Sequence, residues 1–310
     1  MNGVVIGKFY PPHRGHKFLI DNAAGQVDQL TVIVCAHPSQ TISGEQRAEW
    51  LKEIHPGVKI EVTPDDLPDE PEPWARRTIE LLGRRPDVVF TSELYGDGYA
   101  HAMGCRHICV DRNRSTVPIS ATDVRRDPCG NWRYLEACVR AHFARRVVLI
   151  GVESTGKTTL AAELAAKLHT ACVEEYGREY SLHKRNAWQT EDFLAIATEQ
   201  QRRENEAARL ANKVLICDTN ATVTGVWHER YMGFRSPEVE AIGNRDKVDL
   251  YLLAIPDFPF VQDGTRDGEH IRVWMHQRFV DRLEEVGPPV VTLAGSHERR
   301  LQTALEATRG

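Results

Sequence analysis

The sequence lacks paired cysteines, a long apolar run and a surplus of positive charge. Its seven cysteines are scattered, with no Cys-x-x-Cys pair, which argues against a structural zinc site and favours reduced thiols used for packing. No uninterrupted apolar stretch approaches the roughly 20 residues that span a bilayer. Met1 leads directly into a strand-like run, without the basic and apolar regions of a signal peptide. We therefore expect a cytoplasmic protein with no membrane segment.

The charge balance also limits the partners. Lysine and arginine number 39 against 44 aspartates and glutamates, which gives a formal charge of −5. Nucleic-acid binding rests on Lys/Arg contacts to phosphates, so we expect no DNA partner. The 310 residues suit two modest α/β domains. The sequence leaves the oligomeric state open, a homo-oligomer included.

Short apolar runs rich in β-branched residues alternate with helix-like stretches along the chain. Such alternation predicts βαβ units with parallel sheets covered by helices. Five runs precede residue 145 and five begin at or after it: 3–9, 30–36, 58–64, 87–92 and 107–111, then 145–151, 171–176, 213–220, 250–256 and 289–295. Because the pattern restarts, we predict two parallel-sheet domains, 1–144 and 145–310. Residues 131–146 are spaced like an amphipathic helix.

The segment GVESTGKTTL begins at Gly151 and matches the pattern G-x-x-x-x-G-K-[ST] between an apolar strand and an Ala/Leu-rich helix. In this context Gly151 and Gly156 let backbone N–H groups turn toward a phosphate, and Lys157 reaches the β- and γ-phosphates. The Thr158 hydroxyl can ligate Mg²⁺. We expect ATP to bind to Gly151, Glu153, Ser154, Thr155, Gly156, Lys157, Thr158 and Thr159.

Acidic residues end two other predicted strands of this half. Asp218 follows the apolar run VLIC, where it can hold Mg²⁺ through water or accept a proton from an alcohol. Glu174 and Glu175, with Arg178 nearby in the sequence, are further candidates for an acceptor site. The identity of the general base among the three acids stays open.

The segment QDGTRDGEHIR carries Gly264 and Gly268 around Arg266, with Arg272 at the start of the next predicted helix. Glycine hinges that bracket an arginine fit a lid that closes over a transferring phosphate and supplies positive charge. Together with the glycine-rich loop, this segment favours kinase-type phosphoryl transfer, with Arg266 and Arg272 as further ATP-binding residues.

A second strand-to-helix turn lies near the start of the chain, in GKFYPPHRGH. It has the topology of a phosphate site, but with His13 and His16 in place of the lysine. A helix is predicted to begin near His16, and its N-terminal N–H groups together with the histidines can neutralise a triphosphate near its α-phosphorus. Downstream, in ISATDVRRD, Ser120 and Thr122 can cap a helix and bond phosphate oxygens while Arg125 pairs with them.

These motifs carry a resemblance to a known family. GKFYPPHRGH resembles the G-x-F-x-P-x-H-x-G-H signature of the nucleotidylyltransferase superfamily, and ISATDVR resembles the I-S-x-T-x-x-R motif of nicotinamide mononucleotide adenylyltransferases. With the downstream kinase-like half, nearly the whole chain resembles the bifunctional NadR family. Some members of that family begin with a helix-turn-helix domain that represses transcription. Because the first turn starts so close to Met1, we expect no such domain here.

The resemblance implies a Rossmann-like nucleotidylyltransferase domain followed by a P-loop kinase domain. The kinase would convert ribosylnicotinamide to nicotinamide mononucleotide, and the first domain would convert the mononucleotide and ATP to NAD and pyrophosphate. By resemblance, His13 and His16 assist adenylyl transfer, and Trp74 stacks on nicotinamide. The implied ATP-binding positions of the first domain are Gly7, Lys8, Phe9, His13, His16, Ser120, Thr122 and Arg125.

The two implied reactions need different residues. The 5′-hydroxyl of ribosylnicotinamide is a neutral alcohol that loses a proton as it attacks the γ-phosphorus, so a carboxylate such as Asp218 helps. The mononucleotide attacks the α-phosphorus with a phosphate that is already anionic, so positioning and charge neutralisation suffice. We expect Mg²⁺ to serve both steps, because it neutralises phosphate charge and orients the leaving group.

Three other functions agree with part of the sequence. A sulfate-activating adenylyltransferase and kinase has the same pair of reaction types, but its adenylyltransferase is normally much larger than the first domain predicted here. An FAD-forming enzyme is disfavoured because its kinase half is not of the P-loop type. A regulator that senses NAD or ATP without turnover is disfavoured by the intact His13, His16, Lys157 and Asp218.

Overall fold

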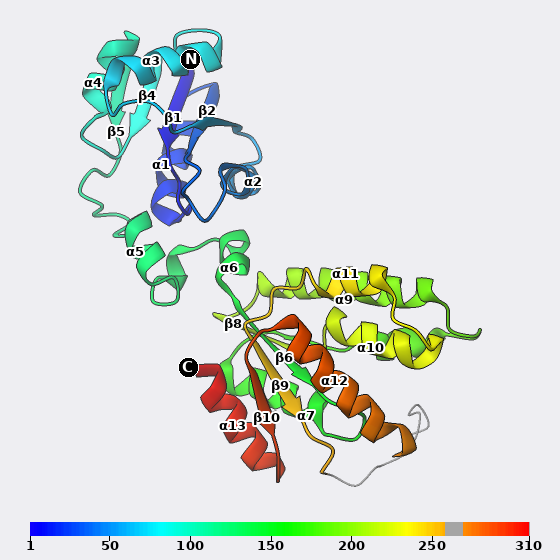
Figure 1. Cartoon of the computed structure of the whole chain (residues 1–310). Coiled ribbons are helices and arrows are strands. Elements are labelled where there is room, and N and C mark those ends of the chain that lie inside the picture. Colours follow the sequence, from blue (N-terminus) through cyan, green and yellow to red (C-terminus); the bar gives the residue numbers. More distant parts are fainter. Residues whose placement is uncertain (258–268, 310) are drawn as a thin grey trace. The chain divides into compact units, whose positions relative to one another are not determined.

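Figure 1 shows the computed structural model of the protein, which describes residues 1–257 and 269–309. The chain divides into two units, Met1–Arg140 and Ala141–Gly310, and the division falls within helix α6 (Ala137–Phe143). Each unit contains a five-stranded sheet whose neighbouring strands are all parallel. The prediction of an α/β protein with two parallel-sheet domains is therefore confirmed.

In the first unit the five predicted apolar runs all form strands. They are β1 (Asn2–Gly7), β2 (Gln29–Ala36), β3 (Lys59–Pro64), β4 (Val88–Thr91) and β5 (Arg106–Cys109), in the order β3-β2-β1-β4-β5. The first strand is thus the central one. Since the chain moves away from β1 to one side and then to the other, the loop that follows β1 lies where the strand order reverses, which is where ligands bind in open α/β sheets.

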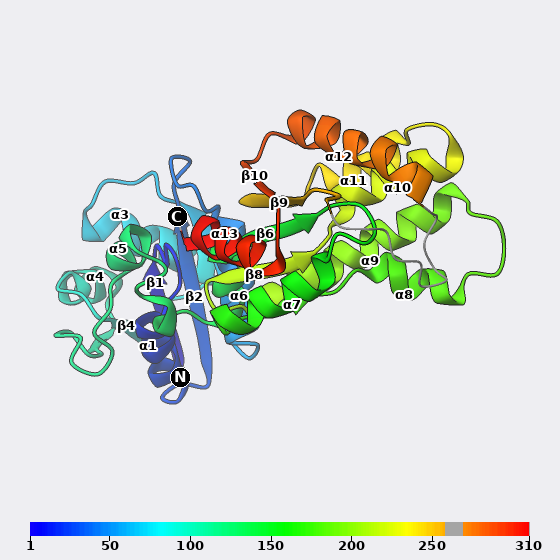
Figure 2. The ribbon, with the colours of Figure 1, turned by 90° about the horizontal axis from the view of Figure 1, so that it is seen from below.

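Helices cover both faces of this sheet (Figures 1 and 2). On one face lie α1 (Arg14–Ala24) and α2 (Gly44–Ile54), on the other α3 (Pro71–Leu82) and α4 (Gly96–Met103), and α5 (Ala121–Arg126) follows β5. Successive residues of β1 serve the two layers, because strand side chains alternate in direction. Val5 packs with Leu19 and Leu51, whereas Val4 packs with Ala75 and Tyr99.

The second unit repeats this arrangement with a different strand order. Its strands are β6 (Arg145–Ile150), β7 (Cys172–Val173), β8 (Val214–Asp218), β9 (Leu250–Ala254) and β10 (Val290–Leu293), in the order β10-β9-β6-β8-β7. Again the first strand of the unit, β6, is central and has strands reached later on both sides. The loop between β6 and the next helix therefore also lies at a reversal of strand order.

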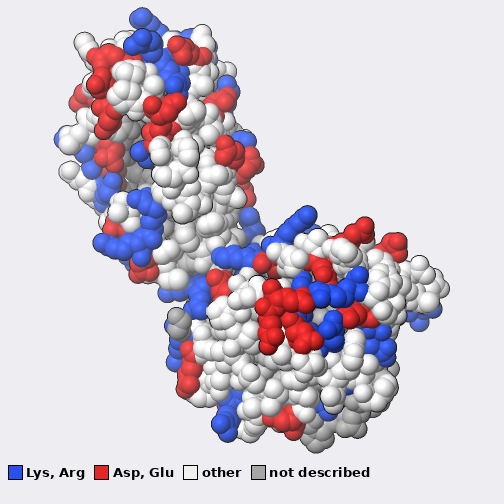
Figure 3. Space-filling model, viewed as in Figure 1, with Lys and Arg blue, Asp and Glu red and all other residues white. Residues whose placement is uncertain are grey.

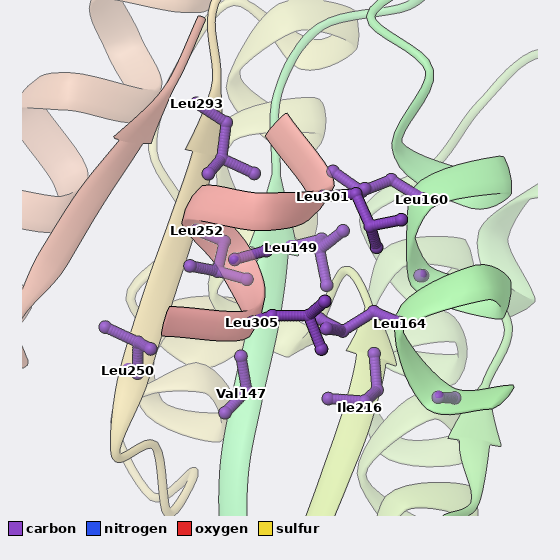
Figure 4. Close-up of a cluster of buried hydrophobic side chains, with 13 residues drawn as sticks. Val147, Leu149, Leu160, Leu164, Ile216, Leu250, Leu252, Leu293, Leu301 and Leu305 are labelled. Carbon is purple, nitrogen blue, oxygen red and sulfur yellow. The ribbon is translucent and has the colours of Figure 1, made fainter. Parts of the chain in front are cut away.

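Two helices, α7 (Lys157–Leu168) and α13 (His297–Arg309), bury one face of the second sheet. Figure 4 shows Leu149 and Ile216 of the sheet meeting Leu160 and Leu164 of α7, with Leu301 of α13 closing the cluster. The remaining helices are α8 (Tyr176–His183), α9 (Thr190–Ala208), α10 (Ala221–Met232), α11 (Pro237–Gly243), η2 (Glu269–Ile271) and α12 (Arg272–Val286). Of these, α9 contacts β7 and β8 and packs against α10 and α11.

The single helix predicted over residues 131–146 is wrong in extent. A short 3-10 helix, η1 (Trp132–Tyr134), is followed by Leu135, which has an extended backbone and is fully buried. Helix α6 follows, and the chain enters β6 at Arg145. The apolar spacing of residues 131–146 suits one continuous helix. The segment is nevertheless interrupted at Leu135, whose extended backbone lets its side chain be buried, and it ends where Arg145 joins the sheet.

The surface carries charges of both signs. On the face shown in Figure 3, acidic and basic side chains lie beside one another in each unit. Many form ion pairs, such as Arg202 and Arg203 with Glu199 on α9. Among the described residues, no helix has both the length and the apolar character needed to cross a membrane.

Arg300 of α13 joins three loops at the carboxyl edge of the second sheet. Its side chain is 1% exposed and donates hydrogen bonds of 3.0–3.1 Å to the backbone carbonyls of Thr155, Ile255 and Gly295. It also pairs with the Asp257 carboxylate, which accepts a hydrogen bond from the N–H of Gly295. The planar guanidinium, with donors in several directions, thus fixes the ends of β9 and β10 to the loop that precedes α7.

Replacing Arg300 by Met is expected to lower the free energy of unfolding by about 3–5 kcal/mol. The substitution leaves three carbonyl groups without their donor and Asp257 without its counter-charge. Urea denaturation of the full chain measures the change. The matched control is Arg299→Met at the exposed neighbouring position, which is expected to change stability by less than roughly 0.5 kcal/mol. Equal stabilities for the two variants would contradict the prediction that Arg300 stabilises the fold by joining these loops.

Candidate functional site

The first candidate site is a cavity of about 320 Å³ in the first unit. Its lining residues come from three stretches, within 8–16, 92–93 and 111–125. The first two stretches directly follow β1 and β4, and the third contains the start of α5. The cavity therefore lies at the carboxyl edge of the sheet, where the strand order reverses.

The two histidines hold each other in this cavity. His13 is the N-cap of α1, and its Nδ1 accepts hydrogen bonds from the N–H groups of Gly15 (3.1 Å) and His16 (3.4 Å). These N–H groups were expected to face a triphosphate, but here they orient the His13 ring. Because Nδ1 is an acceptor, a neutral His13 carries its proton on Nε2, which makes Nε2 a donor. The His16 ring stacks on that of His13 with centroids 3.7 Å apart, and its Nδ1 is buried without a hydrogen-bond partner.

Both rings are neutral at ordinary pH. Burial lowers the pKa of His13 to about 4, and the charge of Arg114 lowers this pKa further. Burial also holds the pKa of His16 well below its usual value, with contributions from His13 and Arg114. Gly15 permits the close packing, since a Cβ there would lie 2.9 Å from Cε1 of the His13 ring.

The ISATDVR motif meets the histidine turn at this cavity. Ser120 is the N-cap of α5, as predicted, and its hydroxyl oxygen accepts a hydrogen bond from the N–H of Asp123 at 3.1 Å. Arg125 donates hydrogen bonds to the carbonyl of Tyr10 and, at 3.0 Å, to the hydroxyl of Thr122. Its guanidinium carbon lies 4.8 Å from the centre of the Tyr10 ring. Two motifs that are far apart in the sequence thus form one site.

Sequence reasoning missed two arginines of this site. Arg47 of α2 is fully buried and donates to the backbone carbonyls of Lys8 and Cys35, which fixes the loop after β1. Arg114 lines the cavity and forms an ion pair with Glu93 at 3.1 Å. Neither arginine belongs to a local pattern that could have singled it out.

The other predicted residues of the first unit lie in different places. Lys8 and Phe9 line the cavity, whereas Gly7 ends β1 and does not. Trp74 lies on α3, is partly buried, and packs with Ile6 against the cluster on the opposite face of the sheet from α1. It does not line this cavity, so its contact with nicotinamide stays a prediction.

The second candidate site is a cavity of about 370 Å³ in the second unit. All eight predicted residues of the glycine-rich loop line it. Gly156 has a left-handed φ of 77°, and a Cβ on Gly151 would lie 2.6 Å from the carbonyl oxygen of Ala254. Lys157 donates from Nζ to the carbonyl of Val152 at 3.1 Å. The two glycines thus have the backbone conformation and close packing that favour a phosphate cradle, and the contact of this loop with ATP stays a prediction.

The three predicted acids differ in their surroundings. Asp218 ends β8 with 1% exposure and is not among the residues that line the cavity. Among the described residues, neither of its buried carboxylate oxygens has a hydrogen-bond partner. Glu175 lines the cavity, and burial raises its pKa against the opposing charge of Lys157; the negative charge of Asp218 raises it as well. Glu174 is exposed and does not line the cavity, whereas Arg178 does line it.

An aromatic wall, defined as Trp188, Phe193, Trp227 and Tyr231, lines the same cavity. The ring centroids of Trp188 and Tyr231 are 5.1 Å apart, and those of Trp188 and Phe193 are 5.2 Å apart. Flat apolar rings near a phosphate loop suit a ligand that joins a planar base to a polar end. The wall comes from the loop before α9 and from α9 and α10, so no local motif announced it.

The predicted lid contributes two arginines, Arg266 and Arg272, to the expected ATP site. Arg266 lies outside the described residues. Arg272 begins α12, as predicted, and its side chain is buried. It is not among the residues that line the second cavity, so its contact with ATP stays a prediction.

Two protein-family models match the chain. The cytidylyltransferase-like family matches residues 4–127, and the AAA domain family matches residues 146–300. Among curated proteins, the trifunctional NAD biosynthesis/regulator protein NadR of Escherichia coli (strain K12) is 31% identical over 312 residues, covering 91% of this chain and 76% of that protein. The protein of the same name from Salmonella typhimurium (strain LT2) is 31% identical over 291 residues, covering 85% of this chain and 71% of that protein.

Two solved structures share the fold. The crystal structure of NadR protein in complex with NR aligns with a TM-score of 0.84 and 23% identity, covering 100% of this chain and 96% of that chain. The crystal structure of NadR protein in complex with NAD and AMP-PNP aligns with a TM-score of 0.78 and 23% identity, covering 99% and 95%.

The buried state of His13 predicts a pH dependence of stability. The pKa of His13 is about 4 in the folded chain and near 6.5 when the ring is free in solution. Between these values the folded chain binds fewer protons than the unfolded one, so the free energy of unfolding falls as the pH is lowered. The His13 contribution to this fall is about 2 kcal/mol from pH 7 to pH 5.

Urea denaturation at both pH values measures this contribution. His13→Asn keeps a side chain that can cap α1 but does not titrate, so it is expected to lose that share of the fall. His37→Asn at an exposed position is the control. The same pH dependence in His13→Asn as in the unaltered chain would contradict the prediction.

Proposed function

The chain belongs to the NadR family, and on this premise we propose that it makes NAD from ribosylnicotinamide in two ATP-dependent steps. The second unit phosphorylates ribosylnicotinamide to nicotinamide mononucleotide. The first unit then transfers the adenylyl group of ATP to the mononucleotide, with release of pyrophosphate. The NadR protein structures hold NR in one case and NAD with AMP-PNP in the other, which are the kinds of ligand that this proposal requires.

The observation that carries the proposal is the chemical difference between the two cavities. Both lie where a central strand turns into a helix, the position suited to phosphate. The first combines neutral, buried imidazoles with Arg114 and Arg125. The second combines Lys157 with the carboxylate of Glu175, and the buried Asp218 lies close enough to alter the pKa of Glu175. An anionic phosphate acceptor suits the first cavity, and an alcohol acceptor suits the second.

In the first unit the attacking group is a phosphate oxygen of the mononucleotide. It forms a bond to the α-phosphorus of ATP as the bond to the bridging oxygen breaks, and pyrophosphate leaves with that electron pair. His13 donates from Nε2, and the His16 ring, which also lines the cavity, is a second donor to the same phosphates. Arg125 and the hydroxyl of Thr122 hold further oxygens. No proton has to be removed, so neutral histidines serve as donors rather than bases.

In the second unit the attacking group is the 5′-hydroxyl of ribosylnicotinamide. The aromatic wall takes the nicotinamide ring, and the hydroxyl then lies toward Lys157 and the N–H groups of the glycine-rich loop. We assign Asp218 as the group that accepts the hydroxyl proton, because its buried oxygens have no competing donor. Glu174 is too exposed for that role.

A magnesium ion fits this site. Among the described residues neither buried carboxylate oxygen of Asp218 has a hydrogen-bond partner, so one oxygen can hold the ion through water while the other stays free to accept the hydroxyl proton. The hydroxyl of Thr158, at the start of α7, supplies a second oxygen of the kind Mg²⁺ prefers. When bound, Mg²⁺ neutralises phosphate charge during transfer.

Separate substitutions test the division between the units. His16→Ala is expected to lower NAD formation from the mononucleotide at least roughly 100-fold while sparing phosphorylation of ribosylnicotinamide. Lys157→Ala is expected to do the reverse. Each purified variant is incubated with MgATP and one substrate at a time, and the products are identified by chromatography. Loss of both activities in a folded variant, or tight ligand binding by the unaltered chain without any product, would contradict the proposal.

A further pair tests the proton acceptor of the kinase step. Asp218→Asn is expected to lower kcat for phosphorylation by about 100-fold to 10,000-fold, because the amide cannot take the hydroxyl proton. Glu174→Gln, the exposed acid of the neighbouring strand end, is the control and is expected to stay within about twofold of the unaltered chain. An equal effect of the two substitutions would exclude Asp218 as the proton acceptor.

A further inference from the structure

The loop between β5 and α5 is built around one carboxylate. Asp111 accepts hydrogen bonds from the backbone N–H groups of Ser115, Thr116 and Val117 at 2.9–3.2 Å, and from the hydroxyl of Ser115 at 3.0 Å. The loop is therefore held by the side chain of its own second residue. Asp111 and Val117 both line the first cavity, so the held loop forms part of its wall.

Arg114 occupies the tip of this loop in a conformation that side chains rarely adopt. Its φ is 50° and that of Asp111 is 49°, both in the left-handed region. The N–H of Arg114 donates to the carbonyl of Asp111 at 2.8 Å, which closes the turn. Strained residues of this kind persist where the surroundings fix them, and they gather at functional sites. In this conformation Arg114 lines the first cavity.

Among the residues that the structure describes, only Glu93 forms an ion pair with the guanidinium of Arg114. It pairs with Glu93 at 3.1 Å, and the two side chains are 46% and 55% exposed. An exposed pair of this kind contributes about 0–1 kcal/mol, so Arg114 can exchange Glu93 for a more highly charged anion at little cost. Arg125, by contrast, is engaged with the Tyr10 carbonyl and the Thr122 hydroxyl and is tied to the histidine turn.

The charge of Arg114 acts on the centre of the cavity. It lowers the pKa of His13 and of His16, so its field reaches both rings that face the proposed phosphates. The same field favours an anion placed beside those rings. Arg114 thus lines the cavity, has only a weak ion-pair partner among the described residues, and acts electrostatically on both histidines. These three properties suit a residue that binds an anionic ligand.

We propose that Arg114 is a further catalytic residue of the adenylyl transfer, whose guanidinium leaves Glu93 and binds the β- and γ-phosphates of ATP. It then stabilises the negative charge that pyrophosphate gains as its bridging oxygen separates from the α-phosphorus. No proton moves, because the guanidinium stays charged throughout. This inference rests on the proposed function of the first unit.

The reverse reaction gives the sharpest test, because pyrophosphate is then a substrate in its own right. The full chain is supplied with NAD and magnesium pyrophosphate, and the formation of ATP is followed. Arg114→Ala is expected to raise the KM for pyrophosphate at least about 10-fold and to lower kcat on the order of 100-fold. The KM for NAD is expected to stay within about twofold, and Arg114→Lys is expected to restore part of the loss.

Two controls accompany these variants. Arg112→Ala removes an exposed arginine of the same loop that does not line the cavity, and it is expected to leave both KM values unchanged. Phosphorylation of ribosylnicotinamide by each variant checks that the second unit is intact, and thermal unfolding checks the first. An unchanged KM for pyrophosphate in Arg114→Ala, or an equal loss in Arg112→Ala, would overturn the inference alone. An unaltered chain that forms neither NAD nor ATP would overturn the proposed function and the inference together.

Discussion

Both cavities depend on one constraint, which is the turn that the backbone must make as it leaves the central strand of a parallel sheet. In each unit the first strand becomes the central one, with later strands added on both sides. The turn after that strand is therefore flanked by loops from neighbouring strands, and the side chains of all of them can converge. Without this order, residues such as His13 and Arg125 would lie at different edges of the protein.

The two units stabilise that turn in different ways. In the first unit side chains do so, because the His13 ring accepts hydrogen bonds from the N–H groups of Gly15 and His16 and Arg47 donates one to the carbonyl of Lys8 in the preceding loop. In the second unit the backbone does so, through the conformations of Gly151 and Gly156. Arg300 adds a hydrogen bond to the carbonyl of Thr155 in the same loop. The first solution occupies helix N–H groups and relies on side-chain donors for anions. In the second unit the backbone of the glycine-rich loop is shaped by its glycines, and Lys157 supplies the positive charge.

Much of the fold followed from the sequence, since ten apolar runs became ten strands and the alternation with helices predicted parallel sheets. The motifs also predicted Ser120 as a helix cap. Local patterns failed where long-range packing decides: residues 131–146 divide into a 3-10 helix, α6 and a strand because Leu135 is buried and the sheet takes Arg145. The aromatic wall and Arg300 escaped notice for the same reason, since their partners are distant in the sequence.

The described residues that line each cavity come from one unit, from residues 8–125 for the first and 151–231 for the second. Substitutions can therefore alter the lining of one cavity without changing the lining of the other. A gene segment that ends near the division in α6 encodes all the described side chains that line one cavity and none that line the other.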